Sequence, residues 1–375
     1  MNITQQRLRT QHLAGAGFHA PADVVRWFGA VQAQDYPGAL WAVGIRTAGA
    51  TEADVEQAVA DRAIVRTWPL RGTLHFVAPE DVRWMLTHFA PRTVARAALR
   101  FKQLELDERT FARSAALFVK ALQGGRQLSR PRMYALLERA GIPTGDNRGL
   151  HILWRCAHDG LICFGAREGK QHTFTLLAEW VPPVTILSRD EALAELALRY
   201  VTSHGPATLK DFGWWSGLSA ADARSALEMA RPDLQSDRIE GAVYWHAGRP
   251  PSRFELWRAS PKPCKGGTDG SAPTRNKARS PHAVLLPPYD EYTVAYQDRG
   301  AALDPKHAAA ARNGIFSPTI LLNGRIAGTW TRRLTNDSVT IGLRSFATLT
   351  DGPARAVAAA AARYGRFIGR PVRID

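Results

Sequence analysis

The amino-acid sequence predicts an α+β fold with several units along the chain, and two patterns support this prediction. A succession of helical stretches that ends in a two-stranded β element recurs three times over residues 1–258. The last part of the chain, residues 282–375, alternates apolar and polar residues as strands do. With 375 residues, 45% of them hydrophobic, the chain is long enough for several domains with substantial cores.

The first unit, residues 1–106, is predicted to contain three helices and a hairpin. A short helix over 4–14 is followed by PADVVRWFGAV, where Pro21 fits a first helical turn. The stretch TEADVEQAVA opens with Thr51 and Asp54 in a capping-box pattern. The strand-like runs AIVRTW and RGTLHFV then close the unit. Helices followed by a two-stranded β element are the order of a winged helix.

The second unit, residues 107–185, and the third, residues 186–258, repeat this order. In the second, the helices SRPRMYALLERAG and GLHILWRCAHDG precede the hairpin LICFGAREGKQHTFTLL. In the third, SAADARSALEMA precedes a hairpin around LQSDRIEGAVYWHA, and we expect Trp214 and Trp215 to lie in its core. A helix directly before a hairpin resembles a recognition helix and its wing. The alternative is an α+β domain whose helices happen to be followed by hairpins.

Residues 259–281 break the pattern, because they are rich in Pro, Gly and Ser and carry five cations against one Asp. They predict a flexible basic loop, which either becomes ordered on phosphates or is a tolerated insertion. After it the chain is rich in strand-like runs, namely VLLPPYDEYTVAY, PTILLNGRIAGTWTRR and SVTIGLRSF. Asn323-Gly324 is a type I′ hairpin signal, and an Ala-rich helix spans 353–365. Residues 282–375 are therefore predicted to form a small β-rich C-terminal domain.

The charge balance favours a polyanionic partner, since 49 Lys and Arg against 34 Asp and Glu give a net charge of +15. A basic composition without functional meaning is the alternative. Three cysteines cannot form a disulfide framework or hold an iron–sulfur cluster, and we expect no cofactor and no metal. The N-terminus lacks a signal-peptide pattern, and no apolar stretch reaches the ~20 residues of a membrane span. We expect a cytoplasmic monomer without a membrane partner.

The segment Gln32-Ala33-Gln34 interrupts an otherwise helical region and is the best candidate for chemistry. On a regular helix, residues two apart point in nearly opposite directions, whereas in an extended segment they lie on the same side. Pro37 disfavours helical geometry at Tyr36. The local sequence therefore permits both amides to act on one target. The alternative is that the two glutamines cap a helix or face solvent.

Five runs in order give the chain a resemblance to a known family: AVQAQDYPGALWAVGIR, RTWPLRGTLHFV, HGPATLKDFGWWSGL, LLPPYDEYTVAYQDR and LLNGRIAGTWTRR. They resemble the bacterial winged-helix family that includes the AlkZ-like alkylpurine DNA glycosylases, over about residues 4–370. The resemblance implies tandem winged helices and a β-rich C-terminal part around a concave basic channel. It also implies a catalytic Gln-x-Gln motif, the form found in one branch, which Gln32 and Gln34 match; another branch has Gln-x-Asp.

The activity that this resemblance implies is hydrolysis of the N-glycosidic bond of cationic N7- or N3-alkylated purines in double-stranded DNA. Some family members act on bulky adducts or interstrand crosslinks. A carboxamide cannot take up a proton as a carboxylate does, but its carbonyl oxygen can orient a water. An alkylated purine already carries positive charge and leaves readily, so placing the water opposite the base is the remaining task. Neutral amides also avoid burying an anion in a dry site.

Two further expectations concern the vicinity of the glutamines. Asp35 follows Gln34 directly and is expected to point away from the lesion. Because no lysine lies near the pair in sequence, we expect a monofunctional enzyme that forms no Schiff base. The alternative function is a non-catalytic winged-helix DNA-binding protein, either a regulator or a lesion binder.

Other residues are candidates for DNA contact. On the first hairpin, Arg71 and His75 either contact phosphates beside the lesion, or are a solvated cation and a satisfied polar residue. We expect Arg66 to be solvated.

At the Asn323-Gly324 hairpin we expect Arg325 at the tip, with Arg332 and Arg333 on the return strand. These arginines could enter the minor groove, while Trp330 is expected in the core. Asp290 and Tyr292 either line the pocket or tie the β-rich domain to the third unit, and we favour the structural role.

Overall fold

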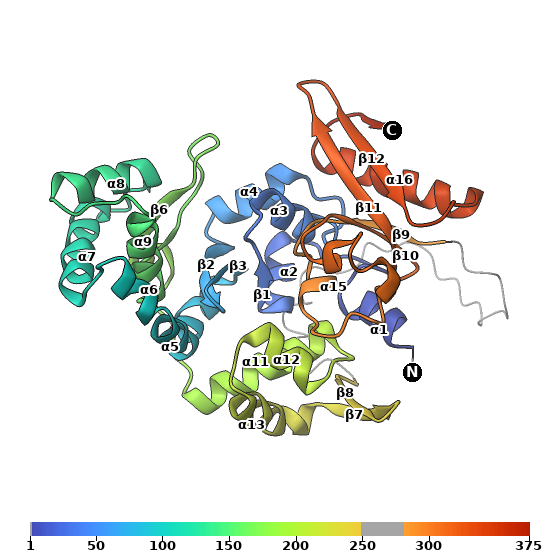
Figure 1. Cartoon of the computed structure of the whole chain (residues 1–375), viewed down its shortest axis with the longest axis horizontal. Helices are drawn as coiled ribbons and strands as arrows, with labels where there is room; N and C mark the ends of the chain where they lie inside the picture. Colours follow the sequence, from blue (N-terminus) through green and yellow to red (C-terminus); the bar gives the residue numbers. More distant parts are fainter. Residues whose placement is uncertain (1, 249–280) are drawn as a thin grey trace, which may run out of the picture.

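A computed structural model describes residues 2–248 and 281–375. The chain has a mixed α+β architecture of four regions. The first region lies in the middle, with the second and the C-terminal regions on opposite sides of it and the third region below (Figure 1). Residues 259–280 of the predicted basic loop lie outside the described residues. Among the residues described, no helix is long and apolar enough to cross a membrane.

The first region has the predicted order of helices and a hairpin. Its elements are α1 (Ile3–Thr10), α2 (Pro21–Phe28), β1 (Ala30–Gln32), α3 (Tyr36–Gly44), α4 (Glu52–Ala60), β2 (Val65–Leu70) and β3 (Thr73–Val77). The capping box at Thr51 and Asp54 is present as predicted. Two helices that the sequence analysis did not predict follow this region, α5 (Pro79–Arg96) and α6 (Ala98–Gln103).

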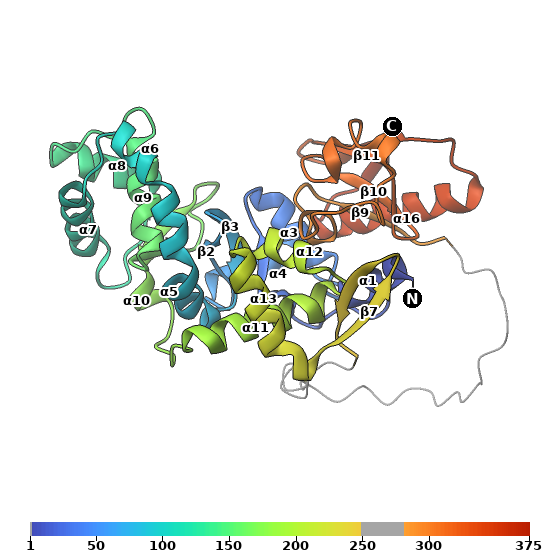
Figure 2. The ribbon, with the colours of Figure 1, turned by 60° about the horizontal axis from the view of Figure 1, so that its bottom comes forward.

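The second and third regions repeat this order, and Figure 2 shows them on different sides of the first. The second contains α7 (Glu108–Leu122), β4 (Leu128–Ser129), α8 (Arg130–Arg139), α9 (Arg148–His158), β5 (Ile162–Phe164), β6 (Thr173–Leu176) and α10 (Leu177–Trp180). The third contains α11 (Arg189–His204), α12 (Leu209–Ser216), α13 (Ala220–Ala230), the short helix η1 (Arg231–Asp233), β7 (Gln235–Ile239) and β8 (Ala242–His246). Ser219 caps α13 as predicted, by accepting a hydrogen bond from the backbone N–H of Asp222.

Trp215 is fully buried in the third region, as expected. The expectation for Trp214 was wrong, because its side chain is 45% exposed. The indole of Trp214 donates to the carbonyl of Val294, so it lies on the surface between the third region and the C-terminal one. Adjacent residues of a helix point in different directions, and only one of this pair can face the core.

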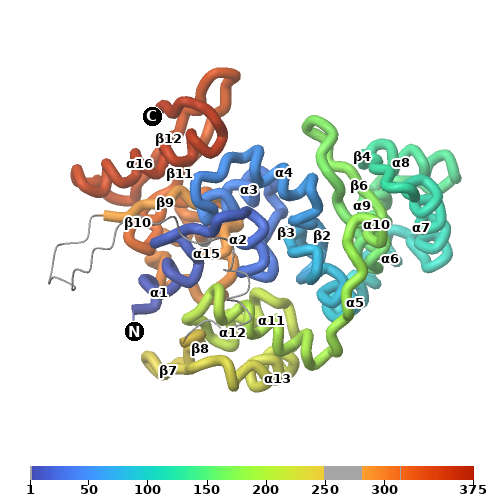
Figure 3. The backbone as a smooth tube through the Cα atoms, turned by 180° about the vertical axis from the view of Figure 1, so that it is seen from behind, coloured from blue at the N-terminus to red at the C-terminus, as the bar shows by residue number. Residues whose placement is uncertain are grey.

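One antiparallel sheet joins the first two regions, with the strand order β1-β3-β2-β5-β6-β4. The junction between β2 and β5 consists of a single residue pair, Arg66 and Phe164. Strand β1 lies at the edge of this sheet, and its Gln32 is paired with His75 of β3. Figure 3 shows the β2–β3 hairpin next to the second region.

The C-terminal region is built on a five-stranded sheet with the order β13-β12-β11-β10-β9. Its elements are β9 (Ala283–Leu286), α15 (Glu291–Val294), η2 (Pro305–His307), η3 (Arg312–Gly314), β10 (Thr319–Leu322), β11 (Arg325–Leu334), β12 (Val339–Ser345), α16 (Asp351–Phe367) and β13 (Val372–Ile374). Asn323 and Gly324 both have positive φ, as the predicted type I′ turn requires. The strand predicted through YDEYTVAY was wrong, because Asp290 caps the short helix α15 there.

The two ends of the chain share one hydrophobic core. Side chains from α2 and α3 pack with those of β9–β12 and α16. Trp41 contacts the rings of Tyr364 and Phe367, with centroid separations of 5.1 and 4.9 Å, and donates to the carbonyl of Leu285. Trp330 is buried in the same core, as expected. The first region therefore reaches its native packing only together with the C-terminal one.

Candidate functional site

The Gln32-Ala33-Gln34 segment is extended between two helices. Helix α2 ends before Gly29, which has a φ of 73°, and α3 begins at Tyr36. Between them β1 pairs with β3, and the N–H of Ala33 continues the ladder by donating to the carbonyl of Leu74. The predicted interruption of the helical region is confirmed. In an extended segment, side chains two residues apart lie on the same side.

The two glutamine side chains are not equivalent. Gln32 is 6% exposed, and its Oε1 accepts a hydrogen bond of 3.0 Å from the backbone N–H of Gln34. Gln34 is exposed, and its Oε1 accepts from the N–H of Leu74 at 3.3 Å. Both carbonyl oxygens are thereby oriented, and each keeps a second lone pair. Of the two, Gln34 lines the cavity described next.

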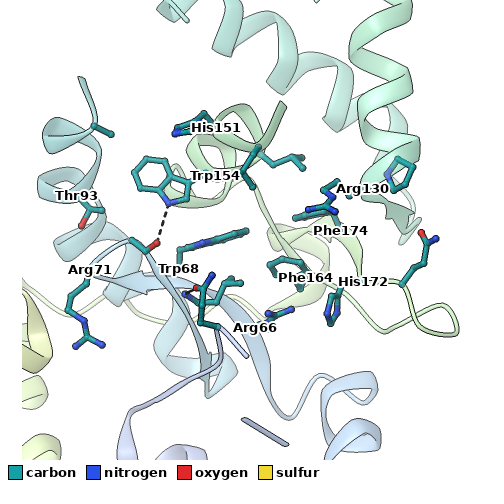
Figure 4. A pocket seen from close by; sticks show the side chains of 18 of the residues that line it. Arg66, Trp68, Arg71, Thr93, Arg130, His151, Trp154, Phe164, His172 and Phe174 are labelled. Atoms are coloured by element: carbon teal, nitrogen blue, oxygen red, sulfur yellow. Dashed lines mark hydrogen bonds between the residues drawn. The ribbon is translucent and has the colours of Figure 1, made fainter. Parts of the chain in front are cut away.

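A cavity of about 900 Å³ lies beside Gln34, between the β2–β3 hairpin and the second region. Four large aromatic side chains surround it, those of Trp68, Trp154, Phe164 and Phe174 (Figure 4). Its cationic lining residues are Arg66, Arg71, Arg130 and Lys170. A volume of this size lies near the upper end of the roughly 300–1,000 Å³ that small-molecule sites occupy.

Arg66 is not solvated, contrary to expectation. Its side chain is 4% exposed, and Nε and Nη2 donate to the carbonyl of Ala33 at 3.2 and 2.9 Å. The guanidinium also lies against the rings of Tyr36 and Phe164, at 5.1 and 4.7 Å from their centroids. Burial lowers the pKa of Arg66 to about 10. The residue between the two glutamines is thus held by a buried cation.

His75 does not contact the surface, which corrects the expectation that it could bind phosphate. It is fully buried, and burial with the nearby Arg71 lowers its pKa to about 3. Because Arg71 can only donate, Nε2 of the neutral imidazole accepts from Arg71 at 3.3 Å, and Nδ1 donates to the carbonyl of Thr73 at 2.9 Å. Arg71 itself is partly exposed with a φ of 54°, and Figure 4 shows its guanidinium directed away from the aromatic rings.

Sequence reasoning missed the buried carboxylate of Glu291. It is 1% exposed, and Oε1 accepts from the backbone N–H of Gln32 at 2.8 Å. Oε2 accepts from Nε2 of His204 at 3.1 Å and from the indole N–H of Trp215 at 3.0 Å. Burial raises the pKa of Glu291, but the hydrogen bonds that the carboxylate accepts from His204 and from the backbone N–H of Gln32 lower it by more, so the net shift is downward. An ionised carboxylate therefore anchors β1.

The neighbours of Glu291 are structural, as we favoured, but their hydrogen bonds reach the first region and the C-terminal region itself, and not the third unit as expected. Asp290 is fully buried and forms a bidentate ion pair with Arg46, with both distances 2.8 Å. Tyr292 is 1% exposed and donates to the carbonyl of Gly324. The same sequence run, Asp-Glu-Tyr, therefore ties the C-terminal region to the first region and to the catalytic candidates. Three adjacent polar residues in an apolar context were the available signal for Glu291.

In the β10–β11 hairpin, Arg325 directly follows the turn, and Arg332 and Arg333 lie on the return strand β11, as expected. The turn of this hairpin is packed against α1, because Gly324 lies against Thr4 and Leu8 and the carbonyl of Asn323 accepts from Gln5. Insertion of this turn into a groove of DNA would require it to separate from α1. Arg325 and Arg333 are exposed, and Arg332 is half-buried and contacts the hydroxyl of Tyr364. The end of the hairpin that projects in Figure 1 is the one between β11 and β12, at residues 335–338.

As expected, Asp35 lies away from the cavity beside Gln34. It lines a separate, smaller cavity together with Trp41 and Arg332. In the ranges 2–248 and 281–375, no group of His, Cys, Asp and Glu side chains is arranged to hold a metal ion. The cavity beside Gln34 is lined by amide, cationic, imidazole and aromatic side chains.

The chain is similar to known proteins along most of its length. The sequence model of the family described as DNA glycosylase AlkZ-like matches residues 25–367. The chain is 25% identical over 343 residues to a protein of Streptomyces sahachiroi named "Interstrand DNA cross-link repair glycosylase", covering 86% of this chain and 85% of the relative. The solved structure of Streptomyces sahachiroi DNA glycosylase AlkZ superposes with a TM-score of 0.74, over 100% of this chain and 98% of that one, at 23% identity.

Proposed function

Because the chain belongs to the AlkZ-like DNA glycosylase family, we propose that it hydrolyses the N-glycosidic bond of cationic N7- or N3-alkylated purines in double-stranded DNA. The family identifies an enzyme of the DNA glycosylase type that acts on DNA. The substrate class, the water-holding role of Gln32 and Gln34, and action without a covalent intermediate belong to the proposal. Bulky adducts and interstrand crosslinks are included as substrates, since the curated relative carries a cross-link repair name.

The observation that carries the proposal is the fixed, uncharged amide pair at the edge of β1. Gln34 faces the cavity, and the Oε1 atoms of Gln32 and Gln34 are each oriented by a backbone N–H. Their free lone pairs would hold a water on the side of the sugar opposite the departing base. The water oxygen bonds to C1′, the C1′–N9 bond breaks, and its electron pair neutralises the cationic purine. The proton of the water passes to solvent, because an amide cannot take it.

The buried charge of Glu291 supports this mechanism. It lies behind β1, is ionised, and makes three hydrogen bonds that use only neutral donors, since burial lowers the pKa of His204. A fixed negative charge favours a cationic base and a sugar with oxocarbenium character. It does so without placing a carboxylate in contact with the DNA. The alkylated purine already carries a positive charge when it leaves. Neutral amides of Gln32 and Gln34 at the reacting bond, with the anionic Glu291 behind them, therefore match the charge of this leaving group.

The three repeated regions support a DNA-binding architecture. We interpret residues 1–106, 107–185 and 186–258 as tandem winged helices, followed by the β-rich domain at 282–375, around a basic channel. The net charge of +15 agrees with a polyanionic partner. Arg325 and Arg333 have exposed side chains and are the proposed phosphate contacts, with half-buried Arg332 beside them. Arg71 is proposed as a further contact through the exposed part of its side chain, since its Nη1 is buried and its Nη2 bonds to His75.

Base release from a duplex with a single 7-methylguanine tests the proposal. The wild type should release the base under single-turnover conditions, and the double variant Gln32→Ala/Gln34→Ala should not. Gln57→Ala is the matched control, because Gln57 lies on α4 and bonds only to Asp61 within the described part of the chain. Release that is equal in the double variant and in the control contradicts the proposal. Unchanged DNA affinity without any release, across several alkyl adducts, indicates the non-catalytic binder instead.

Borohydride trapping tests the monofunctional part of the proposal. Lys170 lies on the turn between β5 and β6 and lines the cavity of Gln34, although it is far from the glutamines in sequence. We expect no covalent DNA adduct, because the amide-held water attacks C1′ directly. An adduct that forms in the wild type and is lost in Lys170→Ala would overturn this assignment.

A further inference from the structure

The helical segment that joins the first and second regions carries a row of exposed arginines. The N-terminal half of α5 is packed into a hydrophobic core, whereas Arg92, Arg96 and Arg100 further along have exposed side chains. Ala97, between α5 and α6, has right-handed helical backbone angles, so the row continues from one helix into the next. Residues four apart lie on the same face of a helix, about 6 Å further along its axis. The Cα atoms of the three arginines therefore span about 12 Å.

No carboxylate neutralises this row within the described part of the chain. Residues 91–104 contain four cations and no Asp or Glu. None of the three arginines forms an ion pair with another described residue, whereas Arg155 and Arg189 each pair with a carboxylate. Arg100 donates to the neutral side chain of Gln103 at 3.3 Å. The charges of the row are therefore available to an external anion.

The row lies at the rim of the cavity beside Gln34. Thr93 and Ala97, each one residue after an arginine of the row, line that cavity. Figure 4 shows Thr93 on a helix at the edge of the cavity. Arg92 itself lines a smaller cavity of about 150 Å³, which also includes residues of the third region. A polyanion bound along the row would therefore run past the cavity that Gln34 lines.

The spacing of the charges fits a phosphodiester backbone. A DNA strand carries one phosphate per about 3.4 Å of helix axis, so about three to four phosphates face a row of about 12 Å. A guanidinium group binds a phosphate through two parallel hydrogen bonds. Such contacts fix the position of a protein on the duplex without reading its sequence. An uninterrupted row of arginines on one helix face is therefore suited to the backbone of a nucleic acid.

The helix and hairpin of the third region have the opposite charge. Residues 219–246, which form α13, η1, β7 and β8, contain five Asp or Glu and three Arg, a net charge of −2. Arg231 among them is paired with Glu228 at 3.1 Å. A recognition helix in the major groove lies between two phosphate backbones, which would repel this face. The third region serves the site from another side, since His204 bonds to Glu291.

We propose that one strand of the DNA duplex runs along α5 and α6, where Arg92, Arg96 and Arg100 bind its phosphates, and that the α13–β7–β8 face of the third region does not contact the DNA. This inference rests on the proposed function, since it places the DNA on which that function acts. The connecting helical segment then binds the phosphates that a recognition helix would otherwise bind. A crosslinked or bulky base need not leave the duplex for these contacts, because the row reaches only the backbone.

The salt dependence of duplex affinity tests this placement. Each phosphate contact contributes about 0.9 to the slope of log Kd against log salt concentration. Arg96→Gln should therefore lower the slope by about 0.9, and the triple variant Arg92→Gln/Arg96→Gln/Arg100→Gln by about 2.7, on damaged and undamaged duplexes alike. Arg224→Gln is the matched control, because Arg224 is an exposed arginine of α13 and loses the same charge. Its slope should equal that of the wild type.

A neutral phosphate locates the contact on the DNA. Methylphosphonates, in which a methyl group replaces a charged oxygen, are placed one at a time along a duplex that carries a single 7-methylguanine. At one position the substitution should weaken binding by the wild type and by Arg224→Gln but not by Arg96→Gln, in which the contact is already lost. An unchanged slope in the triple variant, or no position whose effect depends on Arg96, overturns the inference. A slope that Arg224→Gln lowers as much as Arg96→Gln does overturns the exclusion of the third region.

Failure of this inference and failure of the proposed function give different results. A wild type whose slope depends on the three arginines but which does not release 7-methylguanine from DNA refutes the hydrolysis proposal alone. A wild type that releases the base, with a slope that the three substitutions leave unchanged, refutes the role of the row alone.

Discussion

Replacing Glu291 by Gln tests the anchoring of the catalytic segment, and the structure sets the magnitude. The carboxylate accepts one hydrogen bond at Oε1, from Gln32, and two at Oε2, from His204 and Trp215. An amide can keep the two bonds at Oε2 only by directing its NH2 group toward the N–H of Gln32. That orientation leaves the buried N–H of Gln32 without an acceptor, which costs about 1–3 kcal/mol. The bonds from His204 and Trp215 also lose a charged acceptor, which costs about 1 kcal/mol each.

The loss is offset in part, because an ionised carboxylate is itself costly to bury. We therefore expect Glu291→Gln to lower the free energy of unfolding by about 2–4 kcal/mol near neutral pH. Since the pKa of Glu291 is lowered from 4.5, the carboxylate stabilises the fold above that value, and the benefit is lost as pH falls through the folded pKa. The difference between variant and wild type should accordingly narrow in acid.

Urea unfolding measures this change as a shift of the midpoint at constant m value, and single-turnover base release measures its effect on Gln32. Glu138→Gln is the control, because Glu138 also accepts from a backbone N–H, that of Thr144, but is exposed, so water can replace the lost acceptor. A midpoint for Glu291→Gln equal to that of the control would refute the anchoring role. A large midpoint shift with unchanged base release would refute the link to catalysis.

Three further predictions follow from single contacts. Buried His75 has a pKa of about 3, so between about pH 3 and 6.5 the unfolded chain binds more protons than the folded one. The free energy of unfolding should therefore fall on acidification by up to about 1.4 kcal/mol per pH unit. His75→Gln should make this pH dependence weaker in urea unfolding. Gly44→Ala places a Cβ 2.2 Å from the ring of Phe367 and should cost about 1–3 kcal/mol in the same assay, whereas Gly145→Ala meets nothing within 4 Å and should cost far less. Arg333→Ala should reduce the slope of log Kd against log salt for duplex DNA by about one, and an unchanged slope would remove Arg333 from the phosphate contacts.

Local patterns in the sequence were sufficient for much of the fold. The repeated order of helices and hairpin follows from periodicity and caps, such as Thr51 with Asp54 and Ser219 with Asp222. Pro37 marked the boundary of the helical region correctly, because it lies in the first turn of α3. The expectation that it keeps Tyr36 out of the helix was wrong, since Tyr36 is the first residue of α3. Each of these signals involves residues only a few positions apart, so it can be recognised in the sequence without knowledge of the tertiary structure.

Long-range packing was not predictable in the same way. The bond between Glu291 and Gln32 joins residues 259 positions apart, and no local pattern announces it. Arg66 was expected to be solvated, because an arginine is rarely buried without a carboxylate partner. In the structure its guanidinium donates to the carbonyl of Ala33 and packs against the rings of Tyr36 and Phe164. His75 was a candidate for phosphate contact, but its side chain is fully buried and bonds to Arg71 and to the carbonyl of Thr73. The site therefore depends on contacts that the sequence does not specify locally.

The shared core of the two chain ends has a consequence for the order of events during protein synthesis. Gln32 and Gln34 leave the ribosome early, but Glu291 and the strands that complete their surroundings emerge more than 250 residues later. At about 5–20 residues per second, that delay is roughly ten to fifty seconds. An incomplete nascent chain, or a product truncated before residue 291, would carry the glutamine pair without its anchor. Only a completely translated chain would possess hydrolytic activity, which separates the ability to bind nucleic acid from the ability to cut bases from it.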